Sequence, residues 1–179
     1  SSSLVGSEMC IRDRFISIHC DAHTSNAYGA GTFVLGLQAN ERNLKIAQKE
    51  NSVIFLEDDY QQKYEGFDPN NPESVISLVL MQEDYLDKSI VAANFIQKSF
   101  VNRLKRRDRT VKQAGFLVLR NTFMPSVLVE TGFLTNKSEG SYLNSNKGQN
   151  EMADAISDAI INYFKACLLY TSDAADDDV

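Results

Sequence analysis

Two residues suited to metal-assisted hydrolysis stand at the ends of short apolar runs. His19 closes residues 15–19, FISIH, and Glu130 directly follows residues 126–129, SVLV. In an open α/β sheet the functional site lies outside the carboxyl ends of the strands, so both side chains are expected at one edge of a sheet. Imidazole and carboxylate groups bind zinc and move protons in hydrolytic metal sites. The pattern therefore predicts a metal site that includes His19 and Glu130.

Each candidate also has a structural explanation. A single histidine after a strand is more often a hydrogen-bonded core residue than a metal ligand. Burying a carboxylate costs free energy unless the group is paired. For Glu130, a functional role and a structural role are therefore about equally favoured. Cys20 is expected in the core, because positions alternate along a strand and His19 takes the direction that faces the site. His23 fits the cap of a turn, and the spacing of Cys20, Asp21 and His23 after His19 would not aim their donor atoms at one point.

The elements that must position these residues alternate between strands and helices. Apolar, β-rich runs predict strands at 15–19, 31–37, 115–119 and 126–129, and apolar residues at helical spacing predict helices over 40–56, 74–105 and about 152–164. The basic run at 105–107 suits the negative end of the second helix's dipole. The predicted fold class is α/β, a single domain with a mainly parallel or mixed sheet flanked by helices and truncated at the N-terminus.

The composition is that of one globular domain. The chain has 179 residues, 43% of them hydrophobic, and its three cysteines are too scattered for a disulfide framework or a paired-cysteine zinc site. The net charge of -6 comes mostly from the two ends, so the body offers no basic face for nucleic acid. No apolar run is long enough for a membrane span. We expect a monomer that binds no nucleic acid and has no membrane span.

The two ends of the chain lack the patterns of folded protein. Residues 1–14 have no strand or helix period, and residues 167–179 join a short apolar patch to an acidic run. Both resemble translated sequencing-library adapters, LVGSEMCIRDR at the front and CLLYTSDAAD at the back, although native disordered termini are the alternative. We expect these ends to be non-native, and residues 15–166 to be an internal piece of a longer gene.

Two segments resemble the zinc-dependent N-acetylmuramoyl-L-alanine amidases of the amidase type 3 family. Residues 15–22, FISIHCDA, are similar to the family's SIHxNA segment, with Asp21 where the family usually has Asn. Residues 124–136, MPSVLVETGFLTN, resemble its PxVLVExGFLxN segment. The resemblance covers nearly all of residues 15–166, which implies that they are the C-terminal part of an amidase catalytic domain.

The resemblance implies a peptidoglycan hydrolase that cleaves the amide joining N-acetylmuramic acid to the L-alanine of the stem peptide. His19 would be a Zn²⁺ ligand. Glu130 would be the catalytic carboxylate, taking a proton from the attacking water and returning one to the leaving amine. The implied partners are peptidoglycan and a potential protein activator. The implied location is the periplasm or cell envelope, reached through a secretion signal outside this sequence.

The family has two further zinc ligands, a histidine and a glutamate, upstream of the segment that begins with Phe15. A catalytic zinc normally has three protein ligands and an open position. We therefore expect the parent gene to encode an active amidase, and this chain by itself to be inactive or nearly so. Two other functions stay open at this stage: a non-catalytic relative that binds peptidoglycan or an activator, and a zinc peptidase that acts on the stem peptide.

Residues 38–73 are an insertion in the family pattern. They join the predicted helix over 40–56 to the acidic cluster Glu57, Asp58 and Asp59 and then to a return broken by prolines. A carboxylate of this cluster could occupy the open metal position and inhibit the enzyme until an activator binds. A solvated helix end is the alternative, since charge runs usually face solvent.

Overall fold

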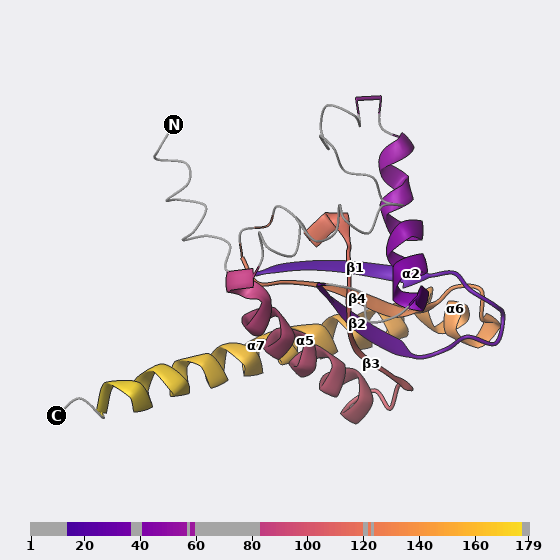
Figure 1. Cartoon of the computed structure of the whole chain (residues 1–179). Helices are drawn as coiled ribbons and strands as arrows, with labels where there is room; N and C mark the ends of the chain where they lie inside the picture. Colours follow the sequence, from indigo (N-terminus) through magenta and orange to yellow (C-terminus); the bar gives the residue numbers. More distant parts are fainter. Residues whose placement is uncertain are drawn as a thin grey trace. The chain divides into compact units, whose positions relative to one another are not determined.

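The computed structural model of the chain describes residues 14–36, 41–56, 58–59, 83–119, 122 and 124–176 (Figure 1). Its contacts divide the chain into two compact units. The first comprises Ser1–Ser17, Phe33–Ile90 and Lys112–Val129, and the second comprises Ile18–Thr32, Val91–Val111 and Glu130–Val179. Within the described ranges, no helix combines the length and the apolar character that crossing a membrane requires.

Among the residues that the structure describes, four strands form one sheet, in the order β1-β4-β2-β3. They are β1 (Phe15–Asp21), β2 (Ala30–Leu35), β3 (Asp108–Ala114) and β4 (Ser126–Phe133). Strands β1 and β4 run in the same direction, because the Phe15 N–H donates to the Pro125 carbonyl at their start and the Leu134 N–H donates to the Asp21 carbonyl at their end.

Strand β2 runs against β1 and β4. Only residues 22–29 connect β1 to β2, whereas a crossover between parallel strands takes a dozen or more residues. Strand β3 is parallel to β2, since the Ala30 N–H donates to the Arg107 carbonyl at one end and the Gly36 N–H to the Ala114 carbonyl at the other. The sheet is therefore mixed, and the predicted α/β class with flanking helices is confirmed.

The described helices follow most of the predicted periods. They are α2 (Glu41–Asn51), the 3-10 helix η1 (Ser52–Leu56), α5 (Glu83–Asn102), the 3-10 helix η2 (Leu117–Leu119), α6 (Lys137–Leu143) and α7 (Asn146–Asp176). The predicted helix over 40–56 corresponds to α2 and η1. The predicted helix over 74–105 ends earlier, at Asn102, and its first part, residues 74–82, lies outside the described residues.

One strand prediction is wrong. Residues 115–119 do not form the expected strand. The strand in this part of the chain is β3, which ends at Ala114, and residues 117–119 form the 3-10 helix η2. β3 has the sequence DRTVKQA, whose residues are mostly exposed or half-buried, so it lacks the apolar run by which buried strands are recognised. The apolar residues at 116–119 are mostly buried as part of the core without forming a strand.

The first unit has its own apolar core. Its buried members come from β2, α2, the end of β3, η2 and β4, and they are Phe33, Leu35, Ala47, Ala114, Phe116, Leu119 and Leu128. The rings of Phe33 and Phe116 meet edge to face, 5.1 Å between centroids. The buried Asn51 side chain ties the end of α2 to this core, donating to the Gly115 carbonyl at 2.7 Å and accepting from the Leu117 N–H at 2.8 Å.

Replacing Asn51 by alanine should destabilise the fold. The change leaves the Gly115 carbonyl and the Leu117 N–H buried without these partners, so we expect the free energy of unfolding to fall by about 2 kcal/mol or more. Urea denaturation measures this loss. The exposed Asn150 of α7 is the matched control, and Asn150→Ala should change the unfolding free energy by no more than about 0.5 kcal/mol. Equal losses in the two variants would contradict the role assigned to Asn51.

The second unit packs α5 and α7 together. The Phe95 and Tyr163 rings meet edge to face, and the Ser99 hydroxyl donates to the Ala155 carbonyl at 2.8 Å. On the strand side of α5, the buried Gln97 amide donates to the Ala30 carbonyl and to Oδ1 of Asp108. The starts of β2 and β3 are therefore held by one side chain of α5.

The insertion is only partly described. Helices α2 and η1 occupy its first part, and Asp58 and Asp59 of the acidic cluster are exposed, which favours the solvated alternative for these two side chains. Glu57 and residues 60–73 lie outside the described residues, as do residues 1–13 and 177–179 of the two predicted non-native ends. The prediction that the insertion is inhibitory and the prediction that the ends are non-native both stay predictions.

Candidate active site

His19 lies near the end of β1, a strand favoured by the β-branched Ile16 and Ile18. Its side chain is half-buried. Its backbone carbonyl accepts a hydrogen bond from the Thr131 hydroxyl of β4 at 2.8 Å. The neighbouring strand therefore fixes the backbone from which the imidazole extends.

Glu130 lies inside β4 and not after its end. The strand continues to Phe133, and all eight of its residues are buried, with Glu130 only 5% exposed. The expectation that Glu130 directly follows a strand is therefore wrong, because the strand ends three residues later. The extension arises because β1 is still alongside, so that the Leu134 N–H reaches the Asp21 carbonyl.

The structure brings the two predicted site residues together. The ligand atoms of His19 and Glu130 lie within 4.8 Å of each other, and both residues belong to the second unit. Two donors on one zinc ion lie about 3.4 Å apart when each bond is about 2.1 Å long, and a base acting on a water beside the metal lies somewhat farther off. The pair therefore fits either two zinc ligands or one ligand and one base.

A further carboxylate was not singled out by the sequence. Glu50, on the last turn of α2 in the first unit, is a half-buried carboxylate. Its signal in the sequence is weak, because a glutamate near the end of an amphipathic helix is commonly a surface residue.

Cys20, Asp21 and His23 have other contacts. Cys20 is exposed, so its predicted place in the core is wrong. Its sulfur lies 3.1 Å from the hydroxyl of Thr131 in β4. Oδ1 of Asp21 accepts from the Ala22 N–H. The His23 ring contacts the Thr24 hydroxyl and the edge of Phe133.

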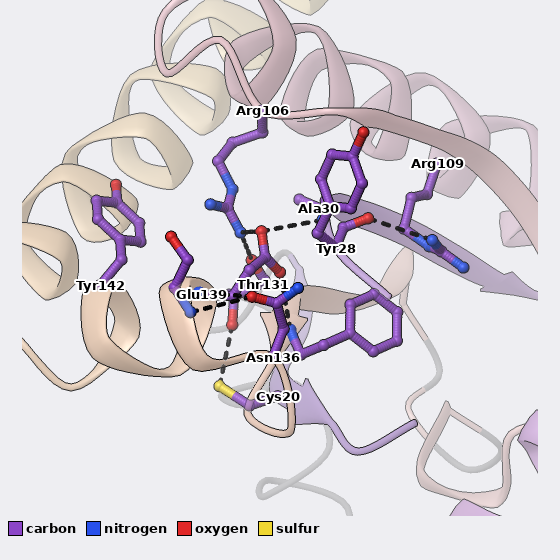
Figure 2. Close-up of polar contacts among 12 residues, drawn as sticks. Cys20, Tyr28, Ala30, Arg106, Arg109, Thr131, Asn136, Glu139 and Tyr142 are labelled. Carbon is purple, nitrogen blue, oxygen red and sulfur yellow. Dashed lines mark hydrogen bonds and ion pairs between the residues drawn. The ribbon is translucent and has the colours of Figure 1, made fainter. Parts of the chain in front are cut away.

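A buried ion pair beside β4 was also missed. Figure 2 shows the Glu139 carboxylate and the Arg106 guanidinium facing each other, with 2.7 Å between Nη2 of Arg106 and Oε1 of Glu139. Helix α6 presents Glu139, and the Asn136 side chain caps this helix by accepting from the N–H groups of Ser138 and Glu139. The pattern Asn-x-x-Glu is a helix-start signal that could have revealed α6. Nothing in the local sequence indicates that Glu139 pairs with Arg106.

Tyr142 lies on the other side of the Arg106 guanidinium. The guanidinium carbon is 5.2 Å from the centre of the Tyr142 ring, and the Tyr142 hydroxyl donates to Oε2 of Glu151 at 2.9 Å. Burial, together with the hydrogen bond to Glu151, raises the pKa of Tyr142 to about 12. The phenol therefore stays neutral, and Glu139 is the acid that balances the charge of Arg106.

Comparison with known proteins identifies the family. A profile for N-acetylmuramoyl-L-alanine amidase matches residues 11–162. The N-acetylmuramoyl-L-alanine amidase AmiA of Salmonella typhimurium is 32% identical over 155 residues, which are 85% of this chain and 52% of that protein. The amidase LytC of Bacillus subtilis is 40% identical over 89 residues, 46% of this chain and 18% of that protein. The chain belongs to the N-acetylmuramoyl-L-alanine amidase family.

Solved structures support the same fold. An N-acetylmuramoyl-L-alanine amidase from Clostridium difficile 630 superimposes with a TM-score of 0.58 at 22% identity, covering 90% of this chain and 62% of that one. The amidase AmiC2 of Nostoc punctiforme gives a TM-score of 0.57 at 20% identity, covering 90% and 63%. The chain therefore has an amidase fold, and it spans about half of the length of AmiA and about three-fifths of each of these two solved chains.

Proposed function

We propose that this chain is part of a peptidoglycan hydrolase that cleaves the amide between N-acetylmuramic acid and L-alanine of the stem peptide. The observation that carries the proposal is the proximity of the buried Glu130 carboxylate and the His19 imidazole, within 4.8 Å, in a member of the amidase family. A buried carboxylate beside an imidazole is a combination that metal-assisted hydrolysis uses.

In this proposal, His19 and Glu130 have different roles. His19 would hold zinc through a ring nitrogen, and Glu130 would accept a proton from the attacking water and return it to the amine that leaves. When bound, zinc lowers the pKa of a water toward ~7 and polarises the carbonyl that is attacked. Strand pairing between β1 and β4 keeps the two side chains at a fixed separation, because both are carried by the same hydrogen-bonded pair of strands.

The remaining zinc ligands are proposed to come from the longer parent protein, upstream of Phe15. The parent is further proposed to act in the periplasm or cell envelope, where its substrate lies. One relative, from Bacillus anthracis, is described as a cell wall amidase. The CwlD amidase of Clostridioides difficile has been solved in complex with the GerS lipoprotein. By analogy with that complex, we propose that a protein activator binds the present protein.

Removing the metal tests this proposal. In the full-length parent, a chelator should lower the release of peptide from purified peptidoglycan by about 100-fold or more, because zinc supplies several kcal/mol of transition-state stabilisation. Zinc should restore the activity, whereas magnesium should not, since imidazole suits zinc and magnesium prefers oxygen ligands. Full activity in a protein shown by elemental measurement to be free of metal would contradict the proposal.

A further inference from the structure

The Arg106–Glu139 pair lies outside the site of His19 and Glu130, yet it is a short and buried ion pair. Its side chains are 13% and 7% exposed, and 2.7 Å separates Nη2 of Arg106 from Oε1 of Glu139. Burying two charges is costly, and an apolar pair of similar volume is often as stable or more so. The pair therefore calls for an explanation beyond packing.

The carboxylate of Glu139 holds two backbone segments at once. Its Oε1 accepts from the Gly29 N–H at 3.0 Å, and its Oε2 accepts from the Phe133 N–H at 3.0 Å. Gly29 directly precedes β2, and Phe133 is the last residue of β4. Glu139 thus joins the end of one strand to the start of its neighbour.

Arg106 extends the same set of contacts to the residue after Glu130. Its Nη2 donates to the Thr131 carbonyl at 3.1 Å, in addition to the ion pair with Glu139. The Thr131 hydroxyl in turn donates to the His19 carbonyl at 2.8 Å, which lets its oxygen accept from the thiol of Cys20 at 3.1 Å. A continuous chain of polar contacts therefore runs from the ion pair to the backbone of His19, passing through the residue next to Glu130.

Gly132 leaves the room that this arrangement needs. A Cβ at this position would lie 2.7 Å from Nη2 of Arg106 and 2.7 Å from Oε2 of Glu139. Both distances are shorter than ordinary contacts, so any larger residue would push the ion pair away from β4. Gly132 therefore allows β4, which carries Glu130, to lie directly against the Arg106–Glu139 pair.

We propose that Arg106 and Glu139 are positioning residues for the hydrolytic site: they hold the backbone of Thr131, Phe133 and Gly29, and through Thr131 that of His19, so that Glu130 and His19 keep one separation. The proposal rests on the proposed function, since it assigns these residues to the same reaction. Neither side chain touches the reacting atoms. Their effect is on the geometry of the two residues that do.

Substitutions in the full-length parent test this role. Glu139→Gln removes the charge and turns an amide N–H₂ toward one of the backbone donors. Arg106→Lys keeps the charge but replaces the planar guanidinium, whose Nη2 reaches both Glu139 and Thr131, by an ammonium of different geometry. We expect each to lower kcat by about 10- to 100-fold, as the loss of outer-shell partners does at metal sites, with KM nearly unchanged. Zinc content should stay nearly unchanged in both.

A matched pair at Thr131 leaves the ion pair itself untouched. Thr131→Val removes the hydroxyl that donates to His19 at almost constant volume, and Thr131→Ser retains it. Thr131→Val should lower kcat by about tenfold, whereas Thr131→Ser should keep most of the kcat of the unaltered protein. Equal activity of the valine and serine variants would overturn the link from the ion pair to His19.

A stability control separates positioning from folding. Met152 is a buried, uncharged residue of α7, so Met152→Ala should lower the unfolding midpoint while leaving kcat of the folded enzyme within about twofold. If Glu139→Gln and Arg106→Lys behave like Met152→Ala, with lower stability but unchanged kcat, the pair is structural only and the proposal is wrong.

Backbone amide exchange gives a readout that does not depend on activity. In the 179-residue chain, Glu139→Gln should speed exchange at Gly29, at Phe133 and at the amides of residues 19–21 by about tenfold or more, while Met152→Ala should not single out these amides. Unchanged local exchange would overturn the proposal even if the parent is an amidase. Altered exchange in a parent that releases no peptide would instead refute the proposed function and leave the structural link standing.

Discussion

Glu130→Gln in the full-length parent should lower kcat by about 1,000-fold, within the range of about 10²- to 10⁴-fold that a general base contributes. Glutamine has nearly the same shape as glutamate but cannot accept the proton of the attacking water. Because glutamine keeps the shape of glutamate, the substitution should leave the fold and KM nearly unchanged, so that the loss appears in kcat. Steady-state kinetics on soluble muropeptides measures both constants.

Zinc content distinguishes the two roles that Glu130 could have. Elemental measurement should find nearly the same zinc in Glu130→Gln as in the unaltered protein, since a base can be lost without losing the metal. Loss of zinc together with activity would make Glu130 a ligand and not the base. Asp154→Asn, the same chemical change at an exposed carboxylate of α7, is the control and should leave kcat unchanged. Activity of Glu130→Gln within a few-fold of the control would refute the role assigned to Glu130.

His19→Ala should weaken zinc binding by more than about 100-fold, because losing even an outer-shell partner costs about 10- to 100-fold. Activity should fall with occupancy and should recover in part at high zinc concentration. The chain has only one other histidine, His23, which is exposed and whose ring contacts Thr24 and Phe133.

His23→Ala is therefore the matched control for His19→Ala. It removes an imidazole four residues away on the same segment and should leave zinc affinity within about twofold. Zinc titration monitored by a competing chelator dye measures both variants. Equal loss of affinity in the two variants, or none in His19→Ala, would remove His19 from the metal site.

The sequence predicted the proximity of the two candidate site residues, which lie within recognisable strand patterns. His19 and Glu130 both follow or belong to apolar, β-branched runs, so their strands and the proximity of their side chains were predictable, and the structure places their ligand atoms within 4.8 Å. The family and the α/β class predicted from the same segments are confirmed. The catalytic and metal-binding roles of the two residues stay predictions.

The errors arise where tertiary pairing overrides local pattern. The polar residues Glu130, Thr131 and Gly132 suggest a strand end, but β4 continues through them because β1 supplies hydrogen-bond partners as far as Asp21. Strand β3 was missed because its polar sequence suits a sheet edge more than a core.

The ion pair behind the site was not predictable from local signals. Arg106 was expected as part of the basic end of a helix, and Glu139, which lies in the first turn of α6, had no predicted role. Only the folded chain shows that the two side chains meet and that Gly132 makes space for them. Pairings between residues far apart in the chain carry no period that a single sequence reveals.

The bond that is cut tests the central claim most directly. Purified peptidoglycan digested with the full-length parent should give, by mass spectrometry, free stem peptides that begin with an unblocked L-alanine, together with glycan strands whose muramic acid lactyl groups end in a free carboxylate. Stem peptides shortened at the far end but still joined to muramic acid would make the protein a peptidase. Binding to peptidoglycan with no bond cut, in zinc-loaded protein, would make it a non-catalytic relative, and either result would contradict hydrolysis of the muramoyl amide by this protein.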